Sequence, residues 1–106
     1  MKTHLLFVCT ANIDRSRAGE ALFENSKRYE AKSAGIHAFA ETRISQEAID
    51  WADVIFCMEH EHKQHIIDNF DVDINKIIVL NITNEYARHD PELEELLREK
   101  LRGWLG

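Results

Sequence analysis

The feature that most constrains this chain is an apolar run followed at once by a cysteine and a polar loop. Residues 5–16 read LLFVCTANIDRS. Leu5 to Val8 are apolar on both faces of an extended segment, which is typical of a buried strand in a parallel sheet. From Ala18 to Lys27 the small and the charged residues fall on opposite sides of a helix. The sequence therefore predicts a tight strand-to-helix loop from Cys9 to Arg15.

A loop of this kind is suited to binding an anion. Its successive backbone N–H groups curl into a concave nest, and the helix that follows adds its unpaired first-turn amides. If the anion is a phosphate ester, the planar guanidinium of Arg15 can hold two of its oxygens. The same surroundings favour the thiolate of Cys9, to which the Ser16 hydroxyl can donate a hydrogen bond. The residues predict a nucleophile aimed at phosphorus.

Strands and helices alternate along the rest of the chain. We expect further strands at 29–34, 54–58 and 77–80, a short helix capped by Ser45, a helix over 59–70 and a last helix from Pro91. Such alternation indicates an α/β fold of three layers, a parallel sheet with helices on both faces, in a single domain over residues 1–106. Cys9, Met58 and the loop after Leu80 then lie at one edge of the sheet, where open parallel sheets bind ligands.

Composition excludes several classes of function. The chain has 19 acidic and 13 basic residues and a net charge of −6, which argues against general affinity for nucleic acid or an anionic membrane. Two cysteines, at positions 9 and 57, do not make a disulfide framework. No signal peptide is apparent, so we expect a cytoplasmic protein, and we expect it to be a monomer. Neither common phosphate-binding glycine motif of nucleotide-binding proteins occurs.

The spacing of Cys9, Arg15 and Ser16 resembles the signature of the low-molecular-weight protein tyrosine phosphatase family. The resemblance implies a four-stranded sheet in the order 2-1-3-4. It also implies a metal-independent, cofactor-free phosphomonoester hydrolase that acts through a phosphocysteine on phosphotyrosine or a similar aryl phosphate, on a protein or a small molecule. Further residues fit the family pattern, namely Asn12, Ser33-Ala34-Gly35, Met58-Glu59 and Asp90-Pro91.

The resemblance assigns the site residues by position. Cys9 is implied as the nucleophile, Arg15 as the phosphate-binding arginine and Asp90 as the general acid. The phosphate-binding loop is implied to comprise Thr10, Ala11, Asn12, Ile13, Asp14, Arg15 and Ser16. Helix-capping preferences alone predict a different role for Asp90, because Asp followed by Pro is also a common N-cap pattern.

Three positions depart from the family pattern. Ala11 replaces a glycine, and Asp14 stands where a second cysteine is common. No aromatic residue follows Pro91 closely, so Phe39 or Tyr86 is the candidate for the pocket wall. Asp14 has two possible arrangements: it caps the first helix and competes with phosphate for the amides, or it points away and pairs with Arg17 or another cation.

Other interpretations remain open at this stage. The histidines at 60, 62 and 65 lack the spacing of a zinc helix, and we expect a solvated helix face rather than a metal site. Cys57 lies in an apolar run and is expected to serve packing. The alternatives to a phosphatase are a phosphocysteine carrier and a phosphate-binding regulatory module with weakened catalysis. The arginine after the loop favours turnover over a carrier.

Overall fold

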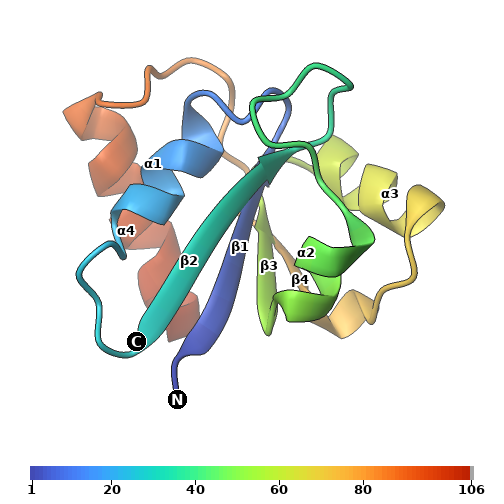
Figure 1. Ribbon diagram of the computed structural model, residues 1–106. Helices are drawn as coiled ribbons and strands as arrows, with labels where there is room; N and C mark the ends of the chain where they lie inside the picture. Colours follow the sequence, from blue (N-terminus) through green and yellow to red (C-terminus); the bar gives the residue numbers. More distant parts are fainter. Residues whose placement is uncertain (106) are drawn as a thin grey trace.

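The computed structural model describes residues 1–105 and contains a four-stranded sheet (Figure 1). All strand pairs are parallel, in the order β2-β1-β3-β4. The predicted fold class and strand order are confirmed. The strands are β1 (Thr3–Cys9), β2 (Tyr29–Gly35), β3 (Val54–Cys57) and β4 (Ile77–Val79).

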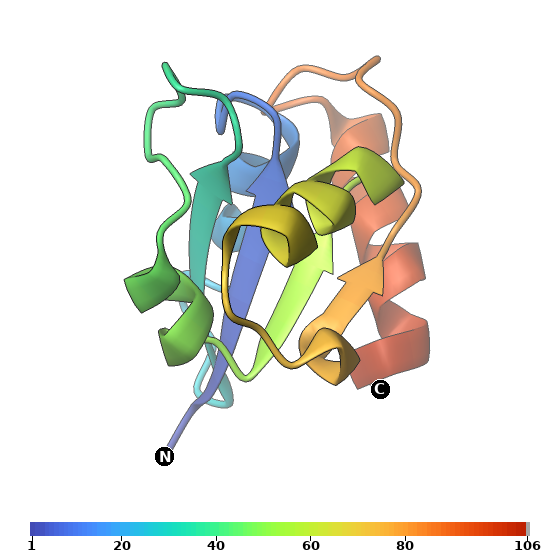
Figure 2. The same ribbon diagram turned by 90° about the vertical axis from the view of Figure 1, so that its right-hand side faces the viewer.

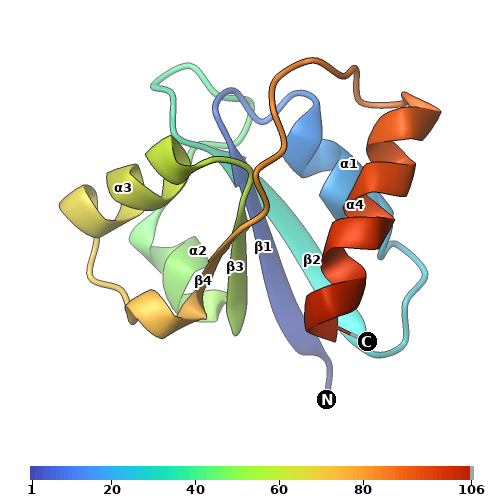
Figure 3. The ribbon, with the colours of Figure 1, turned by 180° about the vertical axis from the view of Figure 1, so that it is seen from behind.

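Two helices cover each face of this sheet. Figures 1 and 3 show α1 and α4 on one side, and α2 and α3 on the other. A short 3-10 helix, Ile74–Lys76, precedes β4. The α-helices are α1 (Arg15–Ala21), α2 (Gln46–Trp51), α3 (His60–Asn69) and α4 (Pro91–Leu105).

The central strand β1 separates two apolar cores. Leu5 and Phe7 point to the core under α1 and α4, whereas Leu6 and Val8 point to the core under α2 and α3. All four side chains are fully buried, because successive residues of a strand face opposite sides of the sheet. The continuous apolar run in the sequence is the consequence of this double burial.

The helix ends agree with the sequence in one case and differ in another. Ser45 caps α2 as predicted, because its hydroxyl accepts a hydrogen bond from the amide of Ala48 at 3.1 Å. The first helix, by contrast, begins at Arg15 and ends at Ala21. The helical pattern predicted through Lys27 was wrong beyond that point, because the next residues form tightened turns, such as the bond from the amide of Phe23 to the carbonyl of Glu20.

The loops that follow β1, β2 and β4 rise at the same end of the sheet (Figure 2). The loop after β2 approaches the loop after β1 closely at Gly35. A Cβ atom at Gly35 would lie 2.6 Å from the Thr10 carbonyl oxygen and 2.9 Å from the Ala11 carbonyl carbon. Only glycine fits this contact without moving the backbone, which explains the glycine of the Ser33-Ala34-Gly35 segment.

Within residues 1–105, no helix has the length and hydrophobicity that crossing a bilayer requires.

Candidate active site

The loop after β1 turns its carbonyl groups outward. The carbonyls from Cys9 to Asp14 each accept a hydrogen bond from a neighbouring segment. The C=O and N–H of one peptide unit point in opposite directions, so the amides of residues 10–15 face the inside of the loop. None of these amides donates to another residue in the part of the chain that the structure describes. The donors to the carbonyls are the amides of Ile36, His37, Glu41 and Ala18 and the Nε atoms of Arg17 and Arg88.

Cys9 lies at the end of β1 with its thiol held by a buried polar network. The Asn12 amide nitrogen donates to the Ser16 hydroxyl at 2.7 Å, and the Ser16 oxygen lies 3.0 Å from the Cys9 sulfur. Since the serine oxygen already accepts from Asn12, its proton is free to be donated to the sulfur. Asn12 itself has a φ of 59°, the left-handed conformation that asparagine tolerates. The network places the Ser16 hydroxyl where it can donate to the Cys9 sulfur.

Arg15 is almost completely buried beneath the loop, with 2% of its side chain exposed. Its Nη1 atom donates to the Glu59 carboxylate and, at 2.6 Å, to the carbonyl oxygen of Ile82. Both of its hydrogen bonds to residues 1–105 use Nη1, which leaves Nε and Nη2 for a ligand. A guanidinium fixed at one corner presents the two remaining nitrogens in a plane that matches two phosphate oxygens.

These groups surround a cavity of about 210 Å³. The structure brings six of the residues expected from the sequence to its wall, whereas Asn12 and Ser16 lie behind Cys9. Asn84, from the loop after β4, also lines the cavity and was missed, because no motif distinguishes an asparagine in a polar loop. The lining residues are Cys9, Thr10, Ala11, Ile13, Asp14, Arg15 and Asn84.

His62 supports the loop from α3. Its Nδ1 accepts the amide of Glu59 at 2.9 Å, so Nε2 carries the proton and donates to the Thr10 hydroxyl at 3.0 Å. The solvated face predicted for this histidine was wrong, because the side chain is fully buried against the phosphate loop. Burial lowers the pKa of His62 to about 4, and the nearby Arg15 cation adds to the effect.

The depressed pKa of His62 makes the folded state sensitive to acid. The unfolded chain takes up a proton on this histidine near pH 6.5, whereas the folded chain resists protonation until about pH 4. We therefore expect the free energy of unfolding to fall between these two values, by on the order of 3 kcal/mol in total. Urea unfolding of the parent and of His62→Gln, from pH 7 to pH 4, measures this loss. Parallel curves for the two proteins would contradict the assignment.

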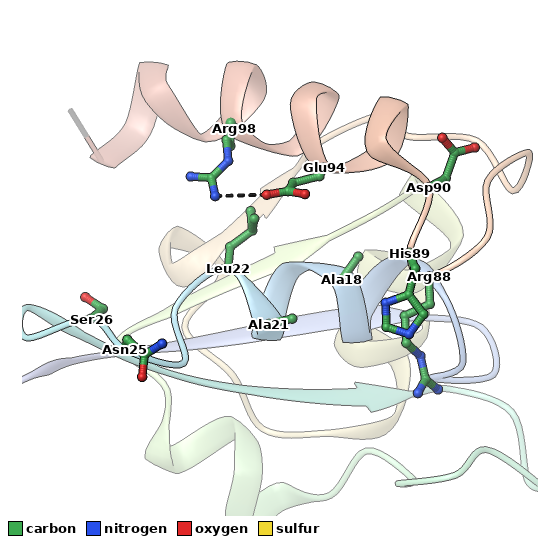
Figure 4. Close-up of a pocket in the computed structure, with 10 residues that line it drawn as sticks. All are labelled: Ala18, Ala21, Leu22, Asn25, Ser26, Arg88, His89, Asp90, Glu94 and Arg98. Carbon is green, nitrogen blue, oxygen red and sulfur yellow. Dashed lines mark hydrogen bonds and ion pairs between the residues drawn. The ribbon is translucent and has the colours of Figure 1, made fainter.

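Asp90 lies outside the set of residues that line the Cys9 cavity. Its carboxylate accepts the amide of Glu92 at 2.9 Å at the start of α4, which is the N-cap arrangement. Asp90 is part of a groove of about 540 Å³ between α1 and α4, and Figure 4 shows its carboxylate turned away from Ala18 and Leu22. Arg98 and Glu94 form an ion pair along α4, on one wall of the same groove (Figure 4).

Asp14 adopts neither of the two arrangements expected from the sequence. It stands at the N-cap position of α1, yet its carboxylate makes no cap hydrogen bond. One oxygen instead accepts the backbone amide of Arg88 at 3.0 Å. The side chain thus contacts the loop after β4 and leaves the amides of the nest free for an anion.

The remaining candidates lie away from the cavity. Phe39 is 89% exposed, Tyr86 packs against the core under α1 and α4, and neither lines the cavity. Cys57 is fully buried, and burial raises the pKa of its thiol to about 12, which keeps it protonated and unreactive.

One group in the described chain brings metal-type ligand atoms within 4.8 Å of one another, namely Glu59, Glu61 and His62. Two of its three members already bond the phosphate loop or its arginine, because Glu59 pairs with Arg15 and His62 bonds Thr10, whereas Glu61 is exposed.

Comparison with known proteins agrees with this geometry. The profile of the low molecular weight phosphotyrosine protein phosphatase family matches residues 4–50, which contain β1, the phosphate loop, α1 and β2. Over these residues the chain is similar to the low-molecular-weight protein tyrosine phosphatases. The protein-arginine-phosphatase of Bacillus subtilis is 27% identical over 138 aligned residues, covering 90% of this chain and 92% of that protein. Because this chain has only 106 residues, that phosphatase carries insertions relative to it.

Solved structures of this phosphatase family extend the match to the whole fold. The arginine phosphatase YwlE from Geobacillus stearothermophilus is 26% identical, with a TM-score of 0.72, and the match covers 95% of this chain and 94% of that chain. The tyrosine phosphatase Wzb from Escherichia coli K30, in complex with phosphate, gives a TM-score of 0.74 over 100% of both chains. At 20% identity, the second likeness concerns the fold alone.

Proposed function

We propose that this chain is a cysteine-dependent phosphatase that forms a phosphocysteine on Cys9. The observation that carries the proposal is the cradle itself: the Cys9 sulfur shares one cavity with inward-facing amides and the guanidinium of Arg15. Amides that face inward, together with an arginine that has two nitrogens without protein partners among the described residues, can bind a phosphoryl group through its equatorial oxygens. A thiolate at the same place is positioned to attack phosphorus.

The first chemical step transfers the phosphoryl group to sulfur. Cys9, held as the thiolate by Ser16, donates an electron pair to phosphorus as the bond to the leaving oxygen breaks. The charge on the equatorial oxygens is stabilised by the loop amides and by Nε and Nη2 of Arg15. The Glu59 carboxylate and the Ile82 carbonyl hold the guanidinium in place without occupying those two nitrogens.

The second requirement is a proton for the leaving oxygen. We assign this role to Asp90, which lies in the same loop as Asn84 at the cavity wall. To act, its carboxyl group must turn from the amide of Glu92 toward the cavity mouth. The same carboxylate then removes a proton from the water that attacks the phosphocysteine and releases phosphate.

The preferred substrate class in this proposal is an aryl phosphate such as phosphotyrosine, carried by a protein or a small molecule. Ile13 supports it, because this apolar side chain lines the cavity while 45% of it stays exposed, available to contact an aromatic ring. A second candidate is protein phosphoarginine, which the arginine phosphatases among the relatives favour. A phosphotyrosyl peptide and a phosphoarginyl peptide, compared by kcat/KM, separate the two candidates.

The proposed activity is tested by hydrolysis of p-nitrophenyl phosphate in the presence of a chelator, with rapid acid quenching and mass measurement of the protein. We expect turnover and a transient mass increase of one phosphoryl group on the peptide that contains Cys9. A stable phosphocysteine that water does not release would instead support a carrier. Phosphate binding without any phosphoenzyme would support the regulatory module.

Replacing Asp90 by asparagine tests the acid. The amide oxygen of the new side chain can still accept the Glu92 amide, so folding is expected to persist. We expect kcat to fall by roughly 100-fold for a poor leaving group such as phenol, and much less for p-nitrophenol, because a good leaving group needs no proton. The slope of log kcat against leaving-group pKa is the measurement, with Glu94→Gln as the control in the same groove. An equal loss of kcat for all leaving groups would show that Asp90 acts as a helix cap and not as the general acid.

The setting of the protein follows from its chemistry. Cys9 and Cys57 are both free thiols, and a cysteine nucleophile requires reducing surroundings, so we propose a cytoplasmic enzyme. We also propose that residues 1–106 act as one domain and as a monomer. The assigned roles use side chains and backbone of this chain, without a metal or cofactor.

A further inference from the structure

Two arginines from distant parts of the chain bind the outside of the phosphate loop in the same way. Arg17, in α1, donates from Nε to the Asn12 carbonyl at 3.4 Å and from Nη2 to Glu41 at 3.0 Å. Arg88, in the loop after β4, donates from Nε to the Ile13 carbonyl at 2.6 Å and from Nη2 to Glu41 at 3.4 Å. Both Nη2 atoms contact the same oxygen of Glu41. We call Arg17, Glu41 and Arg88 the arginine clasp.

The two carbonyls that the clasp holds determine the direction of two amides. Fixing the Asn12 carbonyl outward turns the amide of Ile13 inward, and fixing the Ile13 carbonyl turns the amide of Asp14 inward. The other loop carbonyls are held by backbone amides, three from the loop after β2 and one from α1. This one side of the nest depends on side chains, and these side chains are about one-third exposed.

We propose that the arginine clasp is a positioning device that orients the amides of Ile13 and Asp14 toward the phosphoryl group. This inference rests on the proposed function. Glu41 aligns both guanidinium groups, which would otherwise repel each other, and it comes from the loop after β2. Arg88 adds a second link, because its backbone amide donates to the Asp14 carboxylate. The loop that carries Asp90 is thereby tied to the loop that binds phosphate.

The test measures anion binding separately from turnover. Protection of Cys9 from iodoacetamide by inorganic phosphate gives an affinity that does not require catalysis, and p-nitrophenyl phosphate gives kcat and KM. For Arg88→Ala and for Glu41→Ala we expect phosphate affinity to fall roughly three- to tenfold, the effect of misaligning one or two hydrogen bonds. kcat is expected to fall as well, because the same amides stabilise the transition state.

Two comparisons distinguish positioning from a general loss of structure. Glu41→Gln keeps an acceptor oxygen for the arginines and is expected to retain most of the affinity that Glu41→Ala loses. The double variant Arg88→Ala/Glu41→Ala is expected to lose little more than Arg88→Ala alone, because the groups act as a unit. Arg98→Ala is the matched control, because within residues 1–105 this arginine pairs only with Glu94, and it should leave both phosphate affinity and kcat unchanged.

The outcomes separate this inference from the proposed function. If the parent protein binds phosphate but does not hydrolyse the ester, the proposed function is wrong. The phosphate affinities of the variants still test the arginine clasp in that case. Full turnover with unchanged phosphate affinity and kcat in Arg88→Ala and Glu41→Ala overturns the clasp and leaves the function. A parent that binds no phosphate overturns both.

Discussion

Replacing Cys9 by serine is expected to abolish hydrolysis while the protein continues to bind oxyanions. The hydroxyl is a far weaker nucleophile than the thiolate at neutral pH, so we expect kcat to fall by roughly 10⁴-fold or more. The amides of residues 10–15 and Arg15 do not change, so phosphate or vanadate affinity should stay within about threefold of the parent. Steady-state hydrolysis of p-nitrophenyl phosphate and titration with vanadate give the two quantities.

Cys57→Ala is the matched control for this experiment. Cys57 is buried at the end of β3 and its thiol stays protonated, so its removal should preserve hydrolysis. Substantial turnover by Cys9→Ser would remove Cys9 as the nucleophile. Loss of vanadate binding together with turnover would show instead that the loop had changed shape.

Replacing Arg15 by lysine is expected to reduce both affinity and rate. The guanidinium bonds Glu59 and Ile82 through one nitrogen and keeps two others for phosphate. A lysine has one nitrogen for all of these partners and cannot form the planar two-point contact. We expect kcat/KM to fall by about 10²- to 10³-fold, comparable to removal of a principal oxyanion donor.

Arg102→Lys, on the exposed side of α4, controls for the general effect of exchanging arginine for lysine. Thermal unfolding of both variants shows whether the lysine at position 15 still satisfies the Glu59 carboxylate. Kinetics equal to those of the parent in a folded Arg15→Lys protein would mean that Arg15 does not touch the phosphoryl group.

Much of the fold could be predicted from local patterns. The apolar run from Leu5 to Val8 indicated a central strand because each of its faces meets a separate core. The Ser45 cap could be predicted because it uses an amide three residues away. The end of the first helix could not be predicted, because the pattern of small and charged residues continues past Ala21 whereas the α-helix ends there.

That a cysteine, a loop and an arginine follow a buried strand could be predicted from local sequence, because those groups are neighbours in the chain. The contacts that hold the loop in shape could not be predicted in this way. Glu59 and His62 reach it from α3, while Glu41 and Arg88 come from loops after other strands. No short-range periodicity connects such residues, because parallel strands bring their ends together only through long crossovers. The orientation of Asp14 depends on another such long-range contact, with the amide of Arg88, whereas Asp90 bonds the amide of Glu92 two residues away.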